Sequence, residues 1–152
     1  MARIIVLNSG PLGDACRKRG HPDAERLTLW HHQARANGAL IAIPEIADYE
    51  VRRGLLWDGA LDGIRRLDQL RIDLGHYIPI TTAAMRNAAE LWADARRKGL
   101  ATDDDEGIDA DVILAAQARL FTGLGDRLVV ATNNVKHLSR YVDAQHWARI
   151  IP

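Results

Sequence analysis

The chain has 152 residues, of which 47% are hydrophobic and 26% are charged, a balance that is ordinary for a globular protein with a sizeable core. Its 20 basic and 20 acidic side chains cancel, which excludes an overall positive field as the means of holding a nucleic acid and leaves a local basic patch or bound cations. The single cysteine, Cys16, excludes an internal disulfide and a zinc site made of several cysteines.

The sequence also lacks the usual marks of export and membrane insertion. Its N-terminus has no basic region followed by a long apolar core, and no segment approaches about 18 uninterrupted apolar residues. We therefore expect one domain, residues 1–152, in the cytoplasm. An ordinary helix cysteine accounts for Cys16 there, and a catalytic thiol is the less favoured alternative.

Short apolar segments alternate with amphipathic ones along the chain. Asn37-Gly38 and Gly99 are typical helix ends, Pro44 suits a first helical turn, and Thr81 and Thr82 are suitable N-caps. In chain order, the predicted elements are a strand at 4–7, helices at 12–19 and 23–37, a strand at 39–43, helices at 44–57 and 61–74, a strand at 77–80, helices at 82–98 and 108–121, a strand at 128–131, a short helix, and a strand at 147–151. This alternation predicts an α/β fold, a three-layer α/β/α domain with a central, mainly parallel sheet of five strands.

Two of the predicted strands end in polar residues. The run Ile-Ile-Val-Leu stops at Asn8, which is followed by Ser-Gly-Pro, and the strand at 128–131 runs into Thr132-Asn133-Asn134. Open α/β sheets present functional side chains at the carboxyl ends of their strands, so position 8 is the first candidate. It holds an amide where a carboxylate would be expected. Asn is also a favoured turn residue, so the second motif is weak by itself.

Two carboxylates lie on apolar helix faces. Glu50 is four residues from Ile46, and Asp111 is four residues from Ala115, so both side chains point toward apolar neighbours. Burying an unpaired carboxylate costs several kcal/mol, so each needs a partner or a metal ion. For Glu50 an ion pair with Arg53 stays open as the structural alternative.

For Asp111 the alternative is a favourable interaction with the helix dipole. Asp109 can fill that role, which leaves Asp111 for chemistry. Together, the two strand ends and the two helix faces predict one oxygen-rich pocket of the kind that Mg²⁺ or Mn²⁺ requires. The six histidines have no zinc-like spacing. We expect His31-His32 to lie on a solvated helix face and the acidic stretch 103–106 to be a solvated loop.

Four segments resemble the PIN-domain nucleases, and in particular the VapC-type toxins of bacterial toxin–antitoxin pairs. They are Ile-Ile-Val-Leu-Asn-Ser-Gly-Pro-Leu-Gly, Ile-Pro-Glu-Ile-Ala-Asp-Tyr-Glu-Val-Arg-Arg-Gly, Asp-Val-Ile-Leu-Ala-Ala-Gln-Ala and Thr-Asn-Asn. The resemblance covers nearly the whole chain. It places Asn8, Glu50 and Asp111 at the first three acidic positions of the family. Asn134 falls at the fourth, where the family has Asp or, in many members, Asn.

The resemblance implies a ribonuclease that hydrolyses phosphodiester bonds with Mg²⁺ or Mn²⁺ as cofactor. Glu50 and Asp111 would be the principal metal ligands and catalytic residues, while Asn8, Asn134 and Asp109 complete the metal shell. Arg52 and Arg53 adjoin Glu50 and are the candidates for contacts with the RNA backbone. The family also implies a homodimer and a cognate antitoxin protein as partners.

The amide at position 8 departs from the family pattern. It offers a metal one neutral oxygen and cannot act as a carboxylate base, so cation affinity and turnover should fall. Asn8 is thus either an inactivating change or a natural weakening. The rival hypothesis is a non-catalytic PIN-like module that binds RNA or protein. A flavodoxin-like nucleotide-binding domain is disfavoured, because no Gly-rich phosphate loop follows the first strand.

Overall fold

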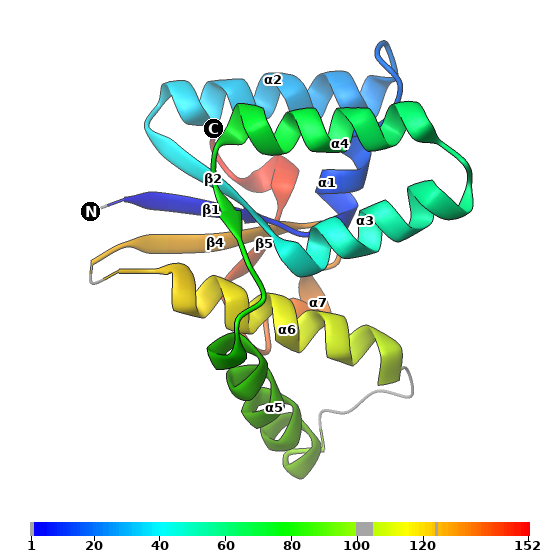
Figure 1. Ribbon diagram of the computed structural model, residues 1–152. Coiled ribbons are helices and arrows are strands. Elements are labelled where there is room, and N and C mark those ends of the chain that lie inside the picture. Colours follow the sequence, from blue (N-terminus) through cyan, green and yellow to red (C-terminus); the bar gives the residue numbers. More distant parts are fainter. Residues whose placement is uncertain (1, 100–104, 124) are drawn as a thin grey trace.

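We describe residues 2–99, 105–123 and 125–152 of a computed structural model, and only the backbone of 105–108. The centre of the molecule is a five-stranded sheet in which all neighbours are parallel, in the order β3-β2-β1-β4-β5 (Figure 1). The strands are β1 (Arg3–Leu7), β2 (Ala39–Pro44), β3 (Tyr77–Ile78), β4 (Arg127–Thr132) and β5 (Ala144–His146). The predicted fold class, with its parallel sheet of five strands, is confirmed.

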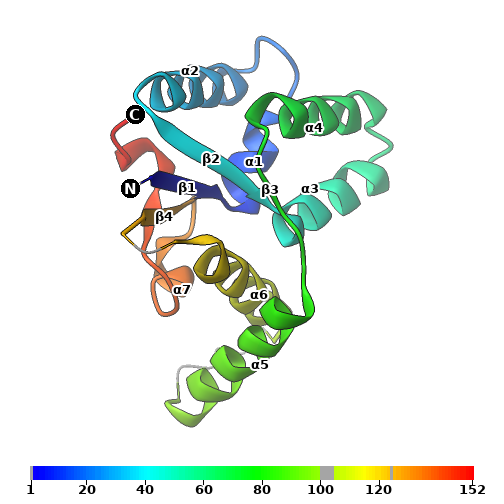
Figure 2. The same cartoon turned by 60° about the vertical axis from the view of Figure 1, so that its left-hand side comes forward.

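Helices cover both faces of this sheet. They are α1 (Ser9–Ala15), α2 (Pro22–Ala36), α3 (Glu45–Trp57), α4 (Leu61–Leu74), α5 (Thr82–Arg97), α6 (Asp105–Phe121) and α7 (Val135–Leu138). Figures 1 and 2 show α2 and α4 on one side of the sheet and α5, α6 and α7 on the other. In the described part of the chain, no helix is both long and apolar enough to cross a membrane.

The first helix begins earlier than the sequence predicted. Asn8 is its N-cap, because the Asn8 side chain accepts a hydrogen bond from the Ser9 N–H at 2.8 Å. Ser-Gly-Pro forms the start of α1, since a proline fits the first helical turn, where its missing N–H has no partner to lose. The helix also ends early, with Cys16 as its C-cap, so the prediction of a helix to residue 19 was wrong.

The last strand was misplaced. It is β5, whereas Trp147–Arg149 form a short 3-10 helix with His146 as its cap. Two of the apolar residues that favoured a strand are core residues reached from a turn: the Trp147 ring packs edge-on to Trp30 at 5.8 Å, and Ile150 is buried. Trp30 Nε1 also donates a hydrogen bond to the Ile150 carbonyl at 2.9 Å. Burial without alternation does not distinguish a strand from such a turn.

The acidic stretch was also partly misjudged. Residues 105 and 106 belong to α6, and residues 103 and 104 lie outside the described residues. Acidic residues are favourable in a first helical turn because of the helix dipole, so they need not mark a loop. Thr81 caps α5 by accepting a hydrogen bond from the Ala84 N–H at 3.1 Å, as the sequence indicated.

His31 is buried rather than solvated, while His32 is exposed. His31 lies on the inner side of α2 with 7% of its surface exposed, and its Nδ1 has no hydrogen-bond partner among the described residues. Burial, with the nearby His32 and Arg35 as lesser causes, lowers the pKa of His31 from 6.5 to about 4. The side chain is therefore neutral at pH 7, and the expectation of a solvated histidine pair was wrong for this residue.

Acidification should consequently weaken the fold through His31. Unfolded His31 titrates near 6.5 and folded His31 near 4, so its contribution to stability is complete above pH 6.5 and is lost as the pH falls toward 4. Between pH 7 and pH 5 the loss should be about 2 kcal/mol. Urea unfolding at both pH values measures it. The His31→Leu chain should lack this loss and His32→Leu should retain it; equal losses in all three chains would contradict the assignment.

Candidate active site

The ends of β1 and β4 are joined by one buried hydroxyl. These strands are parallel neighbours with Leu7 opposite Ala131, so Asn8 and Thr132 follow side by side. Asn8 Nδ2 donates to Thr132 Oγ1 at 2.9 Å, and the Asn134 N–H donates to the same oxygen at 3.0 Å. Thr132 is fully buried. The first and fourth predicted site positions, Asn8 and Asn134, are therefore held through one shared partner.

Helix α1 lies very close to the loop that follows β4. A Cβ atom added at Gly10 would lie 2.7 Å from Asn133 Nδ2, which is closer than real Cβ atoms approach such a group. The same Nδ2 donates a long hydrogen bond, 3.4 Å, to Asp14 Oδ2. The absence of a side chain at Gly10 allows this close approach of α1 to Asn133.

Glu50 lies on the second turn of α3, and 22% of its side chain is exposed. Its carboxylate is 3.8 Å from Arg53 Nη2, a long ion pair. Burial raises the pKa of Glu50, and Arg53 offsets this only in part. The ion pair expected as the structural alternative is thus present, but it leaves the carboxylate with weak charge compensation.

The other predicted ligands differ in exposure. Asp111 is partly buried on α6, beside the buried side chains of Val112 and Ala115, whereas Asp109 is exposed. Asn134 is exposed and is the N-cap residue of α7. Among the described residues, no three His, Cys, Asp or Glu side chains come close enough together to hold a metal ion.

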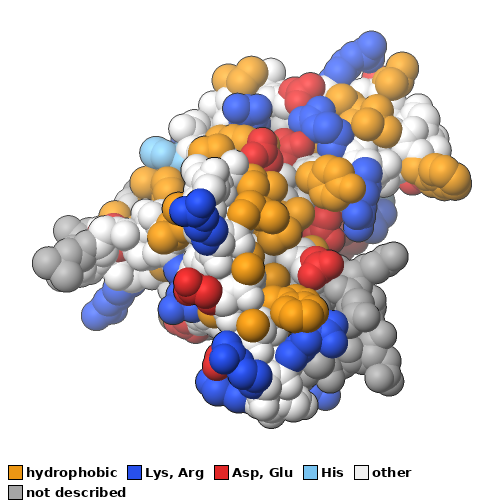
Figure 3. All heavy atoms as spheres, turned by 60° about the horizontal axis from the view of Figure 1, so that its bottom comes forward, with side chains coloured by type: hydrophobic (Ala, Val, Ile, Leu, Met, Phe, Trp, Pro, Cys, Tyr) orange, Lys and Arg blue, Asp and Glu red, His pale blue; other side chains and the backbone are white. Residues whose placement is uncertain are grey.

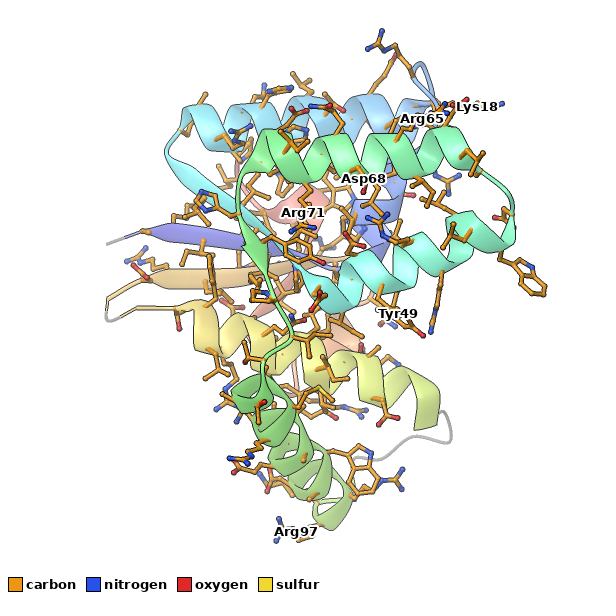
Figure 4. The ribbon with its side chains drawn as sticks, in the orientation of Figure 1. Lys18, Tyr49, Arg65, Asp68, Arg71 and Arg97 are labelled. Carbon is orange, nitrogen blue, oxygen red and sulfur yellow. The ribbon has the colours of Figure 1, made fainter. Side chains whose placement is uncertain are left out.

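The two neighbouring arginines face different cavities. Arg52 donates to Asp48 Oδ1 at 2.8 Å and to Asp68 Oδ1 at 2.7 Å, and these hydrogen bonds raise its pKa. It lines a cavity of about 680 Å³ together with Arg71, whose guanidinium stacks 3.8 Å from the Tyr77 ring centre. Figure 4 shows Asp68 and Arg71 beside this cavity between α3, α4 and β3. Only Arg53 lies on the same side as Glu50.

The second cavity, which we call the α1–α3 cleft, has a volume of about 760 Å³. Ser9, Gly10, Glu50 and Asn133 line it near the edge of the sheet. Basic, acidic and apolar side chains line the remainder, with Lys18, Arg53 and Arg66 among the basic ones and Asp14 and Asp58 as the acidic ones. Cys16 also lines it, but burial raises the pKa of this thiol to about 12, so it stays protonated and is a poor nucleophile.

Two polar residues that organise this region were missed in the sequence. Thr132 was named only as part of the motif Thr132-Asn133-Asn134 and was not predicted as a site residue, although a polar residue directly after Val-Val-Ala was a usable signal. Gln117 was also missed. It is 1% exposed, accepts a hydrogen bond from the Ile46 N–H at 3.3 Å, and donates one to the Ile78 carbonyl at 2.7 Å. An amide within an otherwise apolar helical stripe was its signal.

Replacing Thr132 with valine should lower stability by about 1–2 kcal/mol, because the change removes one acceptor that serves two N–H groups while keeping the shape of the side chain. Urea unfolding measures the loss. Thr28→Val, at an exposed position of α2, is the matched control and should change stability by less than about 0.5 kcal/mol. Equal stability of the Thr132→Val chain and its parent would show that the shared hydroxyl is not structurally important.

Comparison with known proteins identifies the fold. No protein-family model matches the sequence, and no curated protein sequence matches it. A chain in the crystal structure of FitAcB from Neisseria gonorrhoeae matches with a TM-score of 0.70 and 19% identity, over 96% of this chain and 99% of that one. A chain of VapBC2 from Rickettsia felis, bound to a promoter DNA fragment, matches with a TM-score of 0.64 and 21% identity, over 95% and 98%. A chain of DNA-bound VapBC from Salmonella typhimurium matches with a TM-score of 0.62 and 19% identity, over 97% of this chain and 99% of that one. These full-length matches confirm a PIN-like fold for this chain.

Proposed function

We propose that the chain is a PIN-domain ribonuclease of the VapC type, the toxin of a toxin–antitoxin pair, which hydrolyses phosphodiester bonds in RNA. The full-length likeness of its fold to chains from FitAcB and VapBC structures carries this proposal. It is supported by the hydroxyl of Thr132, which holds the first and fourth family positions together at the carboxyl edge of the sheet.

The residues present fit a hard divalent cation by donor type. Glu50 is a half-buried carboxylate whose ion pair with Arg53 is long, 3.8 Å, and such a group gains from a cation beside it. Glu50 and Asp111 would be the principal ligands, with Asn8, Asn134 and Asp109 in the outer part of the shell. Bound Mg²⁺ or Mn²⁺ would supply an activated water and stabilise the charge that develops on the phosphate.

We expect Asn8 to weaken this site through its missing charge. Its Oδ1 already caps α1 and its Nδ2 already donates to Thr132. An aspartate could keep both contacts, since the Thr132 hydroxyl can donate as well as accept. What the amide lacks is the negative charge, so metal affinity is the property that should suffer most.

The partners follow from the same proposal. Two of the matched structures are of VapBC complexes bound to DNA, and by analogy this chain would pair with a cognate antitoxin protein and form a homodimer. It would act as one domain, residues 1–152, in the cytoplasm. In that setting RNA is the substrate and the antitoxin is the inhibitor.

Cleavage of RNA should appear when Asn8 is replaced by aspartate. We expect the Asn8→Asp chain to cut RNA in Mg²⁺ or Mn²⁺ and to stop in EDTA, while the parent cuts at least about 100-fold more slowly, because a metal ligand has lost its charge. Gel analysis of labelled RNA measures both rates. Equal activity in the two chains would mean that an amide suffices at position 8.

In the Asn8→Asp background, Glu50→Gln and Asp111→Asn should each reduce cleavage by about 100-fold or more, since each removes a proposed metal ligand while nearly keeping its shape. Circular dichroism and urea unfolding check that both variants are folded. Asp62→Asn, on the exposed first turn of α4, is the matched control and should cleave like its parent. Full activity in either of the first two variants removes that residue from the mechanism.

A non-catalytic PIN-like module that binds RNA or protein is the second candidate. The neutral Asn8 favours it, as does the lack of any group of three metal-binding side chains among the described residues. Isothermal titration with Mn²⁺ separates the two hypotheses. Absence of Mn²⁺ binding in the Asn8→Asp chain favours the module, and restored binding favours the nuclease.

A further inference from the structure

A cavity of about 500 Å³ lies beside the start of β2, whereas the proposed catalytic edge is where the strands end. The last turns of α2 and α4 line it, together with the turn that leads from α2 into β2 and the residue before β3. Both helices end on the side of the molecule where β2 begins (Figure 1). The cavity uses none of the residues proposed for catalysis, so it is a separate place in the fold.

The titratable side chains that line this cavity are all basic. They are His32 and Arg35 from α2 and His76 from the segment before β3, and no described aspartate or glutamate lines it. All three side chains are exposed, and none forms an ion pair with a described residue. Unpaired basic groups around one cavity repel each other, so an anion between them would stabilise the group.

The neighbouring His31 is affected by the same positive charges. Its ring lies 4.5 Å from the ring of His32. After burial, which is the main cause, the charges of His32 and Arg35 lower the pKa of His31, and Asp73 acts in the opposite direction. Asp73 does not line the cavity, and its carboxylate accepts a hydrogen bond from Gln69 Nε2 at 2.8 Å. The positive charge at the end of α2 is therefore only partly compensated.

The ends of the two helices do not cancel this charge. A helix C-terminus carries about half of a negative elementary charge, so α2 and α4 together supply about one. That balances the guanidinium of Arg35 alone. Histidine ordinarily becomes charged between about pH 8 and pH 5, so His32 and His76 would then add positive charge that the helix ends do not balance. An anion should consequently bind more tightly as the pH falls.

A metal ion is the alternative ligand for two histidines. Arg35 disfavours it, because a guanidinium stays charged and repels a cation at the same cavity. In the described part of the chain, no three His, Cys, Asp or Glu side chains could hold a metal ion together. The donor set therefore fits an anion better than a metal.

We propose that the cavity lined by His32, Arg35 and His76 binds a phosphate group, either as free phosphate or as part of a mononucleotide. The guanidinium offers a planar fork of N–H donors that matches two oxygens of a phosphate, and protonated imidazoles add further charged donors. Cavities of roughly 300–1,000 Å³ enclose small ligands, so the volume suits a phosphate together with the group that carries it. Most of the face seen in Figure 3, by contrast, has basic and acidic side chains interspersed around hydrophobic ones.

Alanine at position 36 gives a test that leaves charge unchanged. Ala36 is the last residue of α2, is exposed, and lines the cavity. A leucine at this position would narrow the cavity, and leucine suits a helix almost as well as alanine does. Loss of phosphate binding in Ala36→Leu would therefore reflect lost space and not a damaged fold.

The experiment follows the amide signals of the full chain, carrying Asn8, by two-dimensional NMR during titration with inorganic phosphate and, separately, with AMP. It is done at about pH 6, with sodium chloride adjusted to hold the ionic strength constant. We expect saturable shifts at Gly38 and Ala39, with a Kd of about 1 mM. Tighter binding of AMP would assign a mononucleotide as the ligand, and equal binding would assign the phosphate group alone.

Sulfate tests the dependence on pH, because it keeps its double charge between about pH 6 and pH 8 while histidine titrates. Its affinity should fall by about tenfold or more over this range. Arg35→Gln, His32→Asn and His76→Asn should each weaken phosphate binding about tenfold at the lower pH, since each removes a charged hydrogen bond. Ala36→Leu should weaken it similarly.

Three controls are matched to these changes. Arg97→Gln removes an exposed cation at the far end of α5 (Figure 4), His137→Asn removes a histidine from α7 across the sheet from α2 (Figures 1 and 2), and Ala89→Leu enlarges an exposed alanine of α5. None should change affinity.

Four results would overturn the phosphate site. They are shifts that do not saturate with phosphate or AMP, equal losses in Arg35→Gln and Arg97→Gln, unchanged binding in Ala36→Leu, and saturable binding of Zn²⁺ in place of phosphate. None of them would affect the nuclease hypothesis, which depends on other residues.

Discussion

The buried side chain of Gln117 is the contact on which the arrangement of the active region most depends. Its two hydrogen bonds, to the Ile46 N–H and to the Ile78 carbonyl, fasten α6 to the start of α3 and to the edge strand β3. Glu50 and Asp111 lie on those two helices, each about one to two turns from this junction. A buried amide is costly unless all its hydrogen bonds are made, so the pairing of α3 with α6 is specific and not merely apolar packing.

The second organising contact, at Thr132, acts on the other half of the region. Gln117 positions two helices, and Thr132 aligns two strand ends. Two neutral, buried polar side chains thus make the contacts that join these elements, and charged residues add to them: Asp14 accepts from Asn133, and Glu45 accepts from the Ile80 N–H. Glu50 and Asp111 make neither contact, so substitution at positions 50 or 111 leaves both in place, whereas Asn8 itself makes one of them.

The fold was predictable because the strands and helices of parallel α/β proteins have strong patterns in the amino-acid sequence. Continuous apolar runs such as Ile-Ile-Val-Leu and Leu-Val-Val-Ala predicted strands, and glycine or threonine at helix ends fixed several helix boundaries. The errors had a common cause, which is that one type of residue can suit two different local structures. A proline that is typical of turns also fits a first helical turn, Trp147 and Ile150 are core residues without a strand, and an apolar pocket can enclose a histidine such as His31.

The contact between Gly10 and Asn133 has a consequence for how this sequence can change over time. The two residues belong to segments more than a hundred positions apart, yet a single methyl group at position 10 would collide with the amide at position 133. Substitution at one position is therefore tolerated only when the other becomes smaller or turns away. Among descendants of this chain, the two positions should show correlated variation, which would record the junction of α1 with the loop after β4 in sequences alone.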